Sequence, residues 1–236
     1  MSRSVIIDAV RTPIGRGKPT GALAGVHPVD LEAAVIRGLV ERTGIDPVDI
    51  DDVIGGAVSQ VGEQSLNVTR NAALAAGLPE SVPATTVDRQ CGSSQQAAAF
   101  AAQGIDAGAY DVAIAGGVEH MGHVPMSHGV DFHPGMAKSV AKASGMMGLT
   151  AEMLGKLHGI SRQQQDEFAA RSHRRAYAAT VEGRFAKEIV GLEGHDASGA
   201  RFALVFGPDE VARGMVADIA IHAPLGADGV EQPHAH

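Results

Sequence analysis

The sequence predicts an α/β fold for residues 1–119, with a parallel sheet covered by helices. Three observations support this. Short apolar runs rich in β-branched residues recur, each is followed by a segment with helical spacing, and the connections are short. Consecutive strands must then be joined through helical crossovers, which makes them parallel. The strand-like runs are residues 5–10, 53–58, 84–87 and 112–115.

Two of these runs are expected to be buried on both faces. Val5–Val10 is almost continuously apolar, which is typical of a strand covered from both sides, so we place it near the centre of the sheet. Residues 53–58 have the same character. Gly55 and Gly56 within that run would let a neighbouring segment approach the backbone closely.

Helices are expected between the strands. The first begins at Pro28, because proline fits the first helical position, and ends before Gly44. The second covers residues 67–76 and stops at a Gly-Leu-Pro sequence. The third covers residues 96–107.

A second region begins after Glu119, where Met and His become frequent and no alternation of strands and helices resumes. Ser161 and Gln164 form a capping box for a helix that should end before Gly183. Residues 150–158 predict a shorter helix, and the part up to residue 199 is expected to be loop and short strand. The predicted domains are residues 1–119, residues 120–213 and a tail of residues 214–236.

Composition restricts the possible functions. With 236 residues and 44% hydrophobic content, the chain can bury a sizeable core. Its net charge of -8 argues against a general nucleic-acid binder, which needs a surplus of Lys and Arg. The single cysteine fits a reducing compartment, and no secretory or membrane-spanning segment is recognisable, so we expect a cytoplasmic protein.

Cys91 is the candidate nucleophile. It lies between a predicted strand and a predicted helix, so the free amides and dipole at the helix start should favour its thiolate by roughly 0.3–1 kcal/mol. Gly92 would let a substrate come close. The alternative is a cysteine packed as a small hydrophobe, which is the commoner role of a free cysteine. Its polar neighbours favour the reactive role.

Several motifs now resemble one family. In the family's order, the chain contains Val-Ile-Ile-Asp-Ala-Val-Arg-Thr-Pro-Ile (residues 5–14), Gln-Cys-Gly-Ser-Ser (90–94) and Gly-Gly-Val-Glu-His-Met (116–121). Together these resemble the thiolases. Residues 122–135 and 145–152 are similar to the 3-ketoacyl-CoA thiolases, in particular the β subunit of the bacterial fatty-acid oxidation complex. The resemblance covers about the first 213 residues.

The resemblance implies a fold and an activity. The fold would be one copy of the duplicated thiolase domain, with a parallel-rich sheet and covering helices, followed by a mostly helical loop domain. Cys91 would attack the keto carbon of a 3-ketoacyl-CoA, release acetyl-CoA and hold the shortened acyl chain as a thioester. A second coenzyme A would then take the acyl group away, as a co-substrate and not as a resident cofactor.

Binding residues and partners follow from the same resemblance. Met147 matches a residue lining the coenzyme A channel, and Arg213 matches an arginine near its nucleotide portion. The alternatives are a methionine that fills the core and a solvated arginine. The expected partners are acyl-CoA substrates and either further copies of the chain or another subunit of a fatty-acid oxidation complex.

The family's remaining catalytic groups are a second cysteine, a histidine in a Gly-His-Pro segment and an asparagine in an Asn-Glu-Ala-Phe segment. The chain has a single cysteine, and the segment around His222 resembles Gly-His-Pro only faintly. We therefore expect a truncated or frame-disrupted thiolase that is inactive by itself.

A dense histidine cluster invites the idea of a metal site. In the resembling family this stretch shapes the substrate entrance without metal, so we expect none here. The cluster consists of His120, His123, His128 and His133 beside Glu119 and Asp131.

Two other functions compete with degradative thiolysis. One is a non-catalytic half-thiolase that binds coenzyme A or pairs with a full-length subunit. The other is a biosynthetic acetoacetyl-CoA thiolase, against which residues 127–135 count.

Overall fold

The computed structural model describes residues 4–131, 134–135, 147–195 and 201–204, in two compact units. The first unit joins the chain up to Val130 with Lys187–Val205, and the second contains Asp131–Ala186. The sequence placed a boundary at Glu119, whereas by its contacts the first unit continues to Val130. No helix in the described residues is long and apolar enough to cross a membrane.

A three-stranded parallel sheet forms the centre of the first unit, as the sequence predicted. Its strands are β1 (Asp52–Gly56), β2 (Ala84–Val87) and β3 (Ala113–Gly117), in the order β2-β1-β3. Val53 pairs with Ala84 on one side and with Ile114 on the other. The carboxyl ends of all three strands therefore meet at one edge of the sheet.

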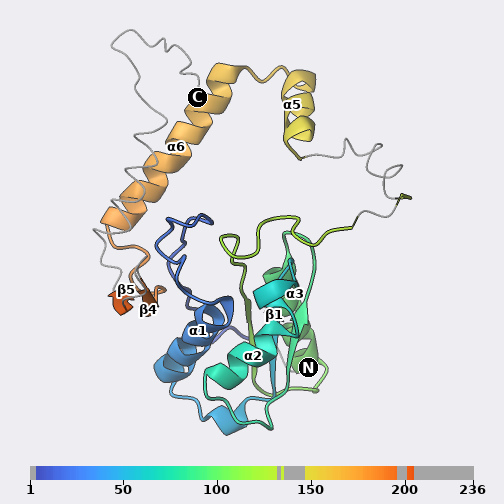
Figure 1. Cartoon of the computed structure of the whole chain (residues 1–236), viewed down its shortest axis with the longest axis vertical. Helices are drawn as coiled ribbons and strands as arrows, with labels where there is room; N and C mark the ends of the chain where they lie inside the picture. Colours follow the sequence, from blue (N-terminus) through green and yellow to red (C-terminus); the bar gives the residue numbers. More distant parts are fainter. Residues whose placement is uncertain (1–3, 132–133, 136–146, 196–200, 205–236) are drawn as a thin grey trace. The chain divides into compact units, whose positions relative to one another are not determined.

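Helices cover both faces of this sheet (Figure 1). Val53 faces α1 (Pro28–Thr43) and α2 (Val68–Ala75), and the next residue, Ile54, packs on α3 (Ser93–Asp106). Successive side chains of a strand point to opposite faces, so the two helical layers enclose β1. This explains why the sequence of β1 is apolar without alternation.

Local signals in the sequence placed the helix ends well. His27 caps α1, Pro28 is its first residue, and Gly44 ends it in a left-handed conformation at φ 66°. Helix α3 begins three residues earlier than predicted, with Gly92 as its N-cap. The start of α3 is therefore directly beside Cys91.

The prediction of a central strand at residues 5–10 is wrong. Among the described residues, no strand pairs with this segment, and Val5, Ile6 and Ile7 are 75%, 90% and 72% exposed. A strand requires a neighbour for its backbone hydrogen bonds, however apolar its sequence. In this part of the chain only Arg11 forms an isolated parallel bridge, with Ile189.

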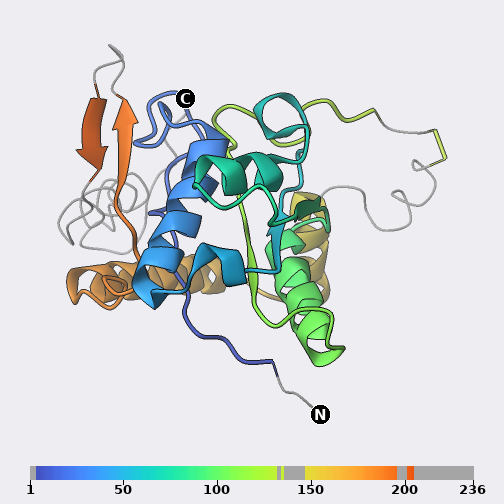
Figure 2. The ribbon, with the colours of Figure 1, turned by 90° about the horizontal axis from the view of Figure 1, so that it is seen from below.

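Short elements complete the first unit. Two 3-10 helices, η1 (Pro47–Asp49) and η2 (Gly62–Gln64), flank β1 in sequence. An antiparallel pair, β4 (Leu192–His195) and β5 (Arg201–Leu204), is visible as two adjacent arrows (Figure 2).

The described residues of the second unit include the helices α5 (Met147–Leu157) and α6 (Arg162–Val181). The predicted capping box is present: Ser161 accepts a hydrogen bond from the backbone of Gln164, whose side chain accepts one from the backbone of Ser161. Helix α5 begins three residues before the predicted start.

Candidate active site

Cys91 lies exposed in the turn between β2 and α3. Its backbone adopts φ 58°, a left-handed conformation that residues with a side chain rarely take. Such a conformation costs on the order of 1 kcal/mol and persists only where the surrounding structure enforces it. The turn thus combines local strain with a solvent-accessible thiol.

Backbone and side-chain hydrogen bonds within the turn hold this conformation. The amide of Gly92 donates to the carbonyl of Arg89 at 2.7 Å. The hydroxyl of Ser93 accepts from the Arg89 amide and donates to the Arg89 carbonyl, both at 3.1 Å. The side-chain amide of Gln90 donates to the carboxylate of Asp88 at 3.0 Å. None of these contacts involves the side chain of Cys91, and the residue is exposed.

The amino terminus of α3 follows at once. Gly92 is its N-cap and has no side chain that could cap the first turn. Amides in the first turn of a helix have no intrahelical acceptor, and they favour anions and carbonyl oxygens placed before them. An oxyanion formed next to Cys91 would meet such donors.

The start of α3 packs directly on the sheet. A Cβ atom at Gly56, the last residue of β1, would lie 2.5 Å from the backbone of Ser93. Gly117, the last residue of β3, has φ 150°, and a Cβ atom there would lie still closer to the backbone of Gly56. The close backbone approach predicted for Gly56 is therefore confirmed.

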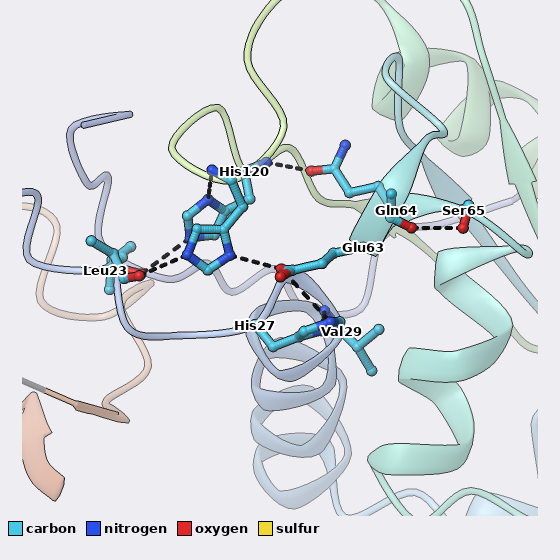
Figure 3. A network of polar contacts seen from close by, with 10 residues as sticks. Leu23, His27, Val29, Glu63, Gln64, Ser65 and His120 are labelled. Carbon is cyan, nitrogen blue, oxygen red and sulfur yellow. Dashed lines mark hydrogen bonds and ion pairs between the residues drawn. The ribbon is translucent and has the colours of Figure 1, made fainter. Parts of the chain in front are cut away.

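A second group of polar residues lies at the same edge of the sheet. The Glu119 carboxylate accepts hydrogen bonds from the Val58 amide at 2.8 Å, the Ser59 amide at 3.4 Å and Gln64 Nε2 at 2.8 Å. Gln64 is fully buried, and its Oε1 accepts from the His120 amide at 2.6 Å (Figure 3). This network joins the loops that follow β1 and β3. Sequence analysis missed Gln64, whose partners Glu119 and His120 are more than fifty residues away.

The first unit also contains a cavity of about 220 Å³. It is lined by residues 12–17, Leu23, Leu31, Glu32, Val35 and residues 117–122. Cys91 does not line it. The cavity is thus separate from the turn that carries the thiol.

Glu32 in the cavity wall is an unusual buried acid. It is 4% exposed, and its Oε1 accepts a hydrogen bond from the Thr69 hydroxyl at 3.1 Å. Among the described residues, its Oε2 has no hydrogen-bond partner. Burial raises the pKa of Glu32 to about 7, although the bond from Thr69 opposes this. Sequence analysis did not identify Glu32, which stands between apolar residues in α1.

The histidine cluster is only partly described. His120 is buried, while His123 and His128 are exposed, and His133 lies outside the described residues. In the part of the chain that the structure describes, no three His, Cys, Asp or Glu residues are arranged to hold a metal ion.

The other predicted binding residues lie away from Cys91 in the chain. Met147 is the first residue of α5 in the second unit and is 72% exposed. Arg213 and His222 lie outside the described residues.

Comparison with known families decides the relationship. The model of the thiolase N-terminal domain matches residues 4–219. The chain belongs to the thiolase family. Within this thiolase chain the matched range contains the Cys91 turn, the Glu119 network and the cavity.

Known thiolases agree with this assignment. The 3-ketoacyl-CoA thiolases of Aeromonas hydrophila and Shewanella oneidensis are 66% and 59% identical over 214 residues. A crystal structure of the Bacillus anthracis acetyl-CoA acetyltransferase superposes with a TM-score of 0.72 at 35% identity, covering 86% of this chain and 54% of that one. The matches cover 90% of this chain, which spans about half the length of its curated relatives (54%).

Proposed function

We propose that Cys91 is the acyl-accepting nucleophile of a 3-ketoacyl-CoA thiolase. The observation that carries this proposal is the exposed thiol on a left-handed turn immediately before an uncapped helix start. A merely packed cysteine has no need of either feature. The thiol of a nucleophile requires both access to substrate and donors for the developing oxyanion.

The reaction proceeds in two balanced steps. The thiolate sulfur of Cys91 attacks the keto carbon, C3. The bond from C3 to C2, the carbon next to the thioester carbonyl, then breaks. Its electron pair remains on acetyl-CoA as an enolate, which takes up a proton, while the shortened acyl chain stays on sulfur as a thioester. Coenzyme A then loses its thiol proton and attacks the thioester, which releases the shortened acyl-CoA and the Cys91 thiolate.

The high identity to two 3-ketoacyl-CoA thiolases supports the degradative substrate class. The acetyl-CoA acetyltransferase, at 35% identity, is a more distant relative. We therefore favour 3-ketoacyl-CoA substrates of varied chain length over acetoacetyl-CoA alone. Association with further copies or with another subunit of fatty-acid oxidation is part of the same proposal.

The two proton transfers need an acid and a base that Cys91 does not supply. Residues 1–236 contain no second cysteine to serve as one of them. For this chain alone we expect acyl transfer to Cys91 to be separable from rapid turnover.

Mass spectrometry of the intact protein tests the proposal. The chain is incubated with acetyl-CoA, acetoacetyl-CoA or a longer 3-ketoacyl-CoA, and the acylated residue is located by peptide mapping. We expect one acyl group on Cys91, removable by free coenzyme A. The Cys91→Ser variant should remain unmodified under the same conditions.

Acylation of other residues to the same extent in the Cys91→Ser variant would contradict the proposal. A chain that accepts only two-carbon acyl groups would overturn the substrate class and leave the nucleophile intact. Turnover of acetoacetyl-CoA with free coenzyme A at a rate typical of enzymes would refute the expected inactivity of the chain alone.

A further inference from the structure

The imidazole of His123 lies between two hydrogen-bond acceptors. Its Nδ1 is 2.7 Å from Oε2 of Glu63, and its Nε2 is 2.7 Å from the carbonyl oxygen of Ala24. A carboxylate and a carbonyl both accept hydrogen bonds, so each ring nitrogen must carry a proton. A neutral imidazole carries only one, and both contacts are satisfied together only by the imidazolium.

These contacts join three segments that are distant in sequence. Ala24 precedes α1, Glu63 is in η2, and His123 is in the loop after β3. The ring of His123 stacks on that of His120, with centroids 4.0 Å apart. His123 therefore lies where the segment before α1, the helix η2 and the loop after β3 meet.

His120 has the opposite protonation pattern. Its Nδ1 accepts from the His123 amide at 3.1 Å, and its Nε2 faces the carbonyl of Leu23 at 3.1 Å (Figure 3). One acceptor role and one donor role are satisfied by the neutral ring. Of the two stacked histidines, only His123 requires the charged form.

We propose that protonated His123 acts as a pH-sensitive clamp, which ties the segment before α1 and helix η2 to the loop after β3 and releases them when it loses its proton. On deprotonation the ring keeps one N–H, so either Glu63 or Ala24 loses its donor. Leu23 and His120, which adjoin the clamp, line the cavity. Release of the clamp thus loosens one wall of that cavity.

The groups around the imidazole of His123 favour its protonated form. Burial by itself lowers the pKa of His123, but the hydrogen bond to Glu63, the bond to Ala24 and the attraction of the Glu63 carboxylate outweigh it and raise the pKa. His27 also faces Glu63, with its Nε2 3.7 Å from Oε2. The stabilisation is therefore complete below the ordinary histidine range and is lost as the pH rises through the raised value.

Other ionisable groups nearby are distinguishable from the clamp. Glu119 is held by the buried Gln64 and two backbone amides, and Arg16 and Glu32 line the cavity. Glu32 also titrates near neutrality, so its effect must persist in a His123 variant. The clamp accounts for the part of the pH response that disappears when His123 is replaced.

NMR of histidine ring carbons and nitrogens in the full chain tests the charge state. We expect both His123 nitrogens to carry protons in the clamped form, and the His123 titration to lie above the ordinary histidine value. Glu63→Gln keeps the shape of the side chain and removes its charge, and it should shift the His123 titration to lower pH. Titration of His123 at or below the ordinary histidine value, or no shift in Glu63→Gln, would contradict the proposal.

Hydrogen exchange tests the release. Protection factors of the His123 and Val124 amides, both bonded to His120, are compared at about pH 6 and pH 9 against the intrinsic exchange rates. In the unmodified chain we expect at least about tenfold less protection at the higher pH. His123→Gln should have low protection at both values, and the control His128→Gln should behave as the unmodified chain. Equal pH responses in His123→Gln and His128→Gln would refute the clamp.

Discussion

The turn after β2 and the loop after β3 lie at the same edge of one sheet, yet they are stabilised in different ways. The turn around Cys91 is held by short-range bonds among residues 88–93, and it presents a thiol on a left-handed backbone. The loop from Glu119 to His123 is braced by side chains and carbonyls from segments far away in the chain. Cys91 is thus exposed in a turn held by local contacts, whereas the loop after β3 is held by long-range contacts.

The largest effect is expected at Gly56, whose backbone lies close both to the start of α3 and to Gly117 at the end of β3. Gly56→Ala should reduce the free energy of unfolding by about 3 kcal/mol, since its Cβ would collide with the backbone of Ser93. Gly116→Ala is the matched control, because a Cβ there meets nothing within 4 Å. Denaturant unfolding of both variants checks this. Equal stability of the two would mean that α3 does not pack on β1 as described.

A pH-dependent effect of up to about 3 kcal/mol is expected from Glu32. Burial raises its pKa from 4.5 to about 7, so its contribution is complete below pH 4.5 and is lost as the pH rises through about 7. Glu32→Gln should therefore show a smaller loss of stability between about pH 5 and pH 8 than the unmodified chain. Parallel pH curves for the two proteins, measured by urea unfolding, would exclude a buried, uncompensated acid.

Replacing Glu119, at the start of the loop after β3, should reduce the free energy of unfolding by roughly 2 kcal/mol. Glu119→Gln removes the charge that strengthens the bonds from Val58, Ser59 and Gln64, and hydrogen bonds to a charged group contribute about 1.5–3 kcal/mol. Thermal unfolding checks the loss. Glu80→Gln, on an exposed residue, is the control and should change stability little.

The smallest effect concerns the strain at Cys91. Glycine adopts φ 58° without steric cost, so Cys91→Gly should be more stable than Cys91→Ala by about 0.5–1 kcal/mol. Chemical unfolding of the two variants makes the comparison. A less stable glycine variant would show that the left-handed backbone is not enforced in solution.

Sequence reasoning succeeded where the chemistry is local. Pro28 and Gly44 delimit α1, and Ser161 with Gln164 begins α6, because each signal acts within one turn of the helix. The apolar pattern of β1 was sufficient because its neighbours β2 and β3 lie within the same compact unit.

The same reasoning failed where the outcome depends on distant partners. Val5–Val10 is as apolar as β1, but no described strand lies beside it. The network of Gln64, Glu119 and His120 and the burial of Glu32 arise from tertiary contacts, which no local pattern encodes. The position of Cys91 before a helix was predicted, whereas its left-handed backbone was not.

The central claim is that the fold itself makes Cys91 reactive. The most direct measurement is the rate of alkylation of Cys91 by iodoacetamide at neutral pH, in the folded chain and in the chain unfolded by urea, with reagent consumption followed by mass spectrometry. Our account predicts faster alkylation in the folded chain, because the turn presents the sulfur to solvent beside the free amides of α3. Slower alkylation in the folded chain than in the unfolded one would contradict it.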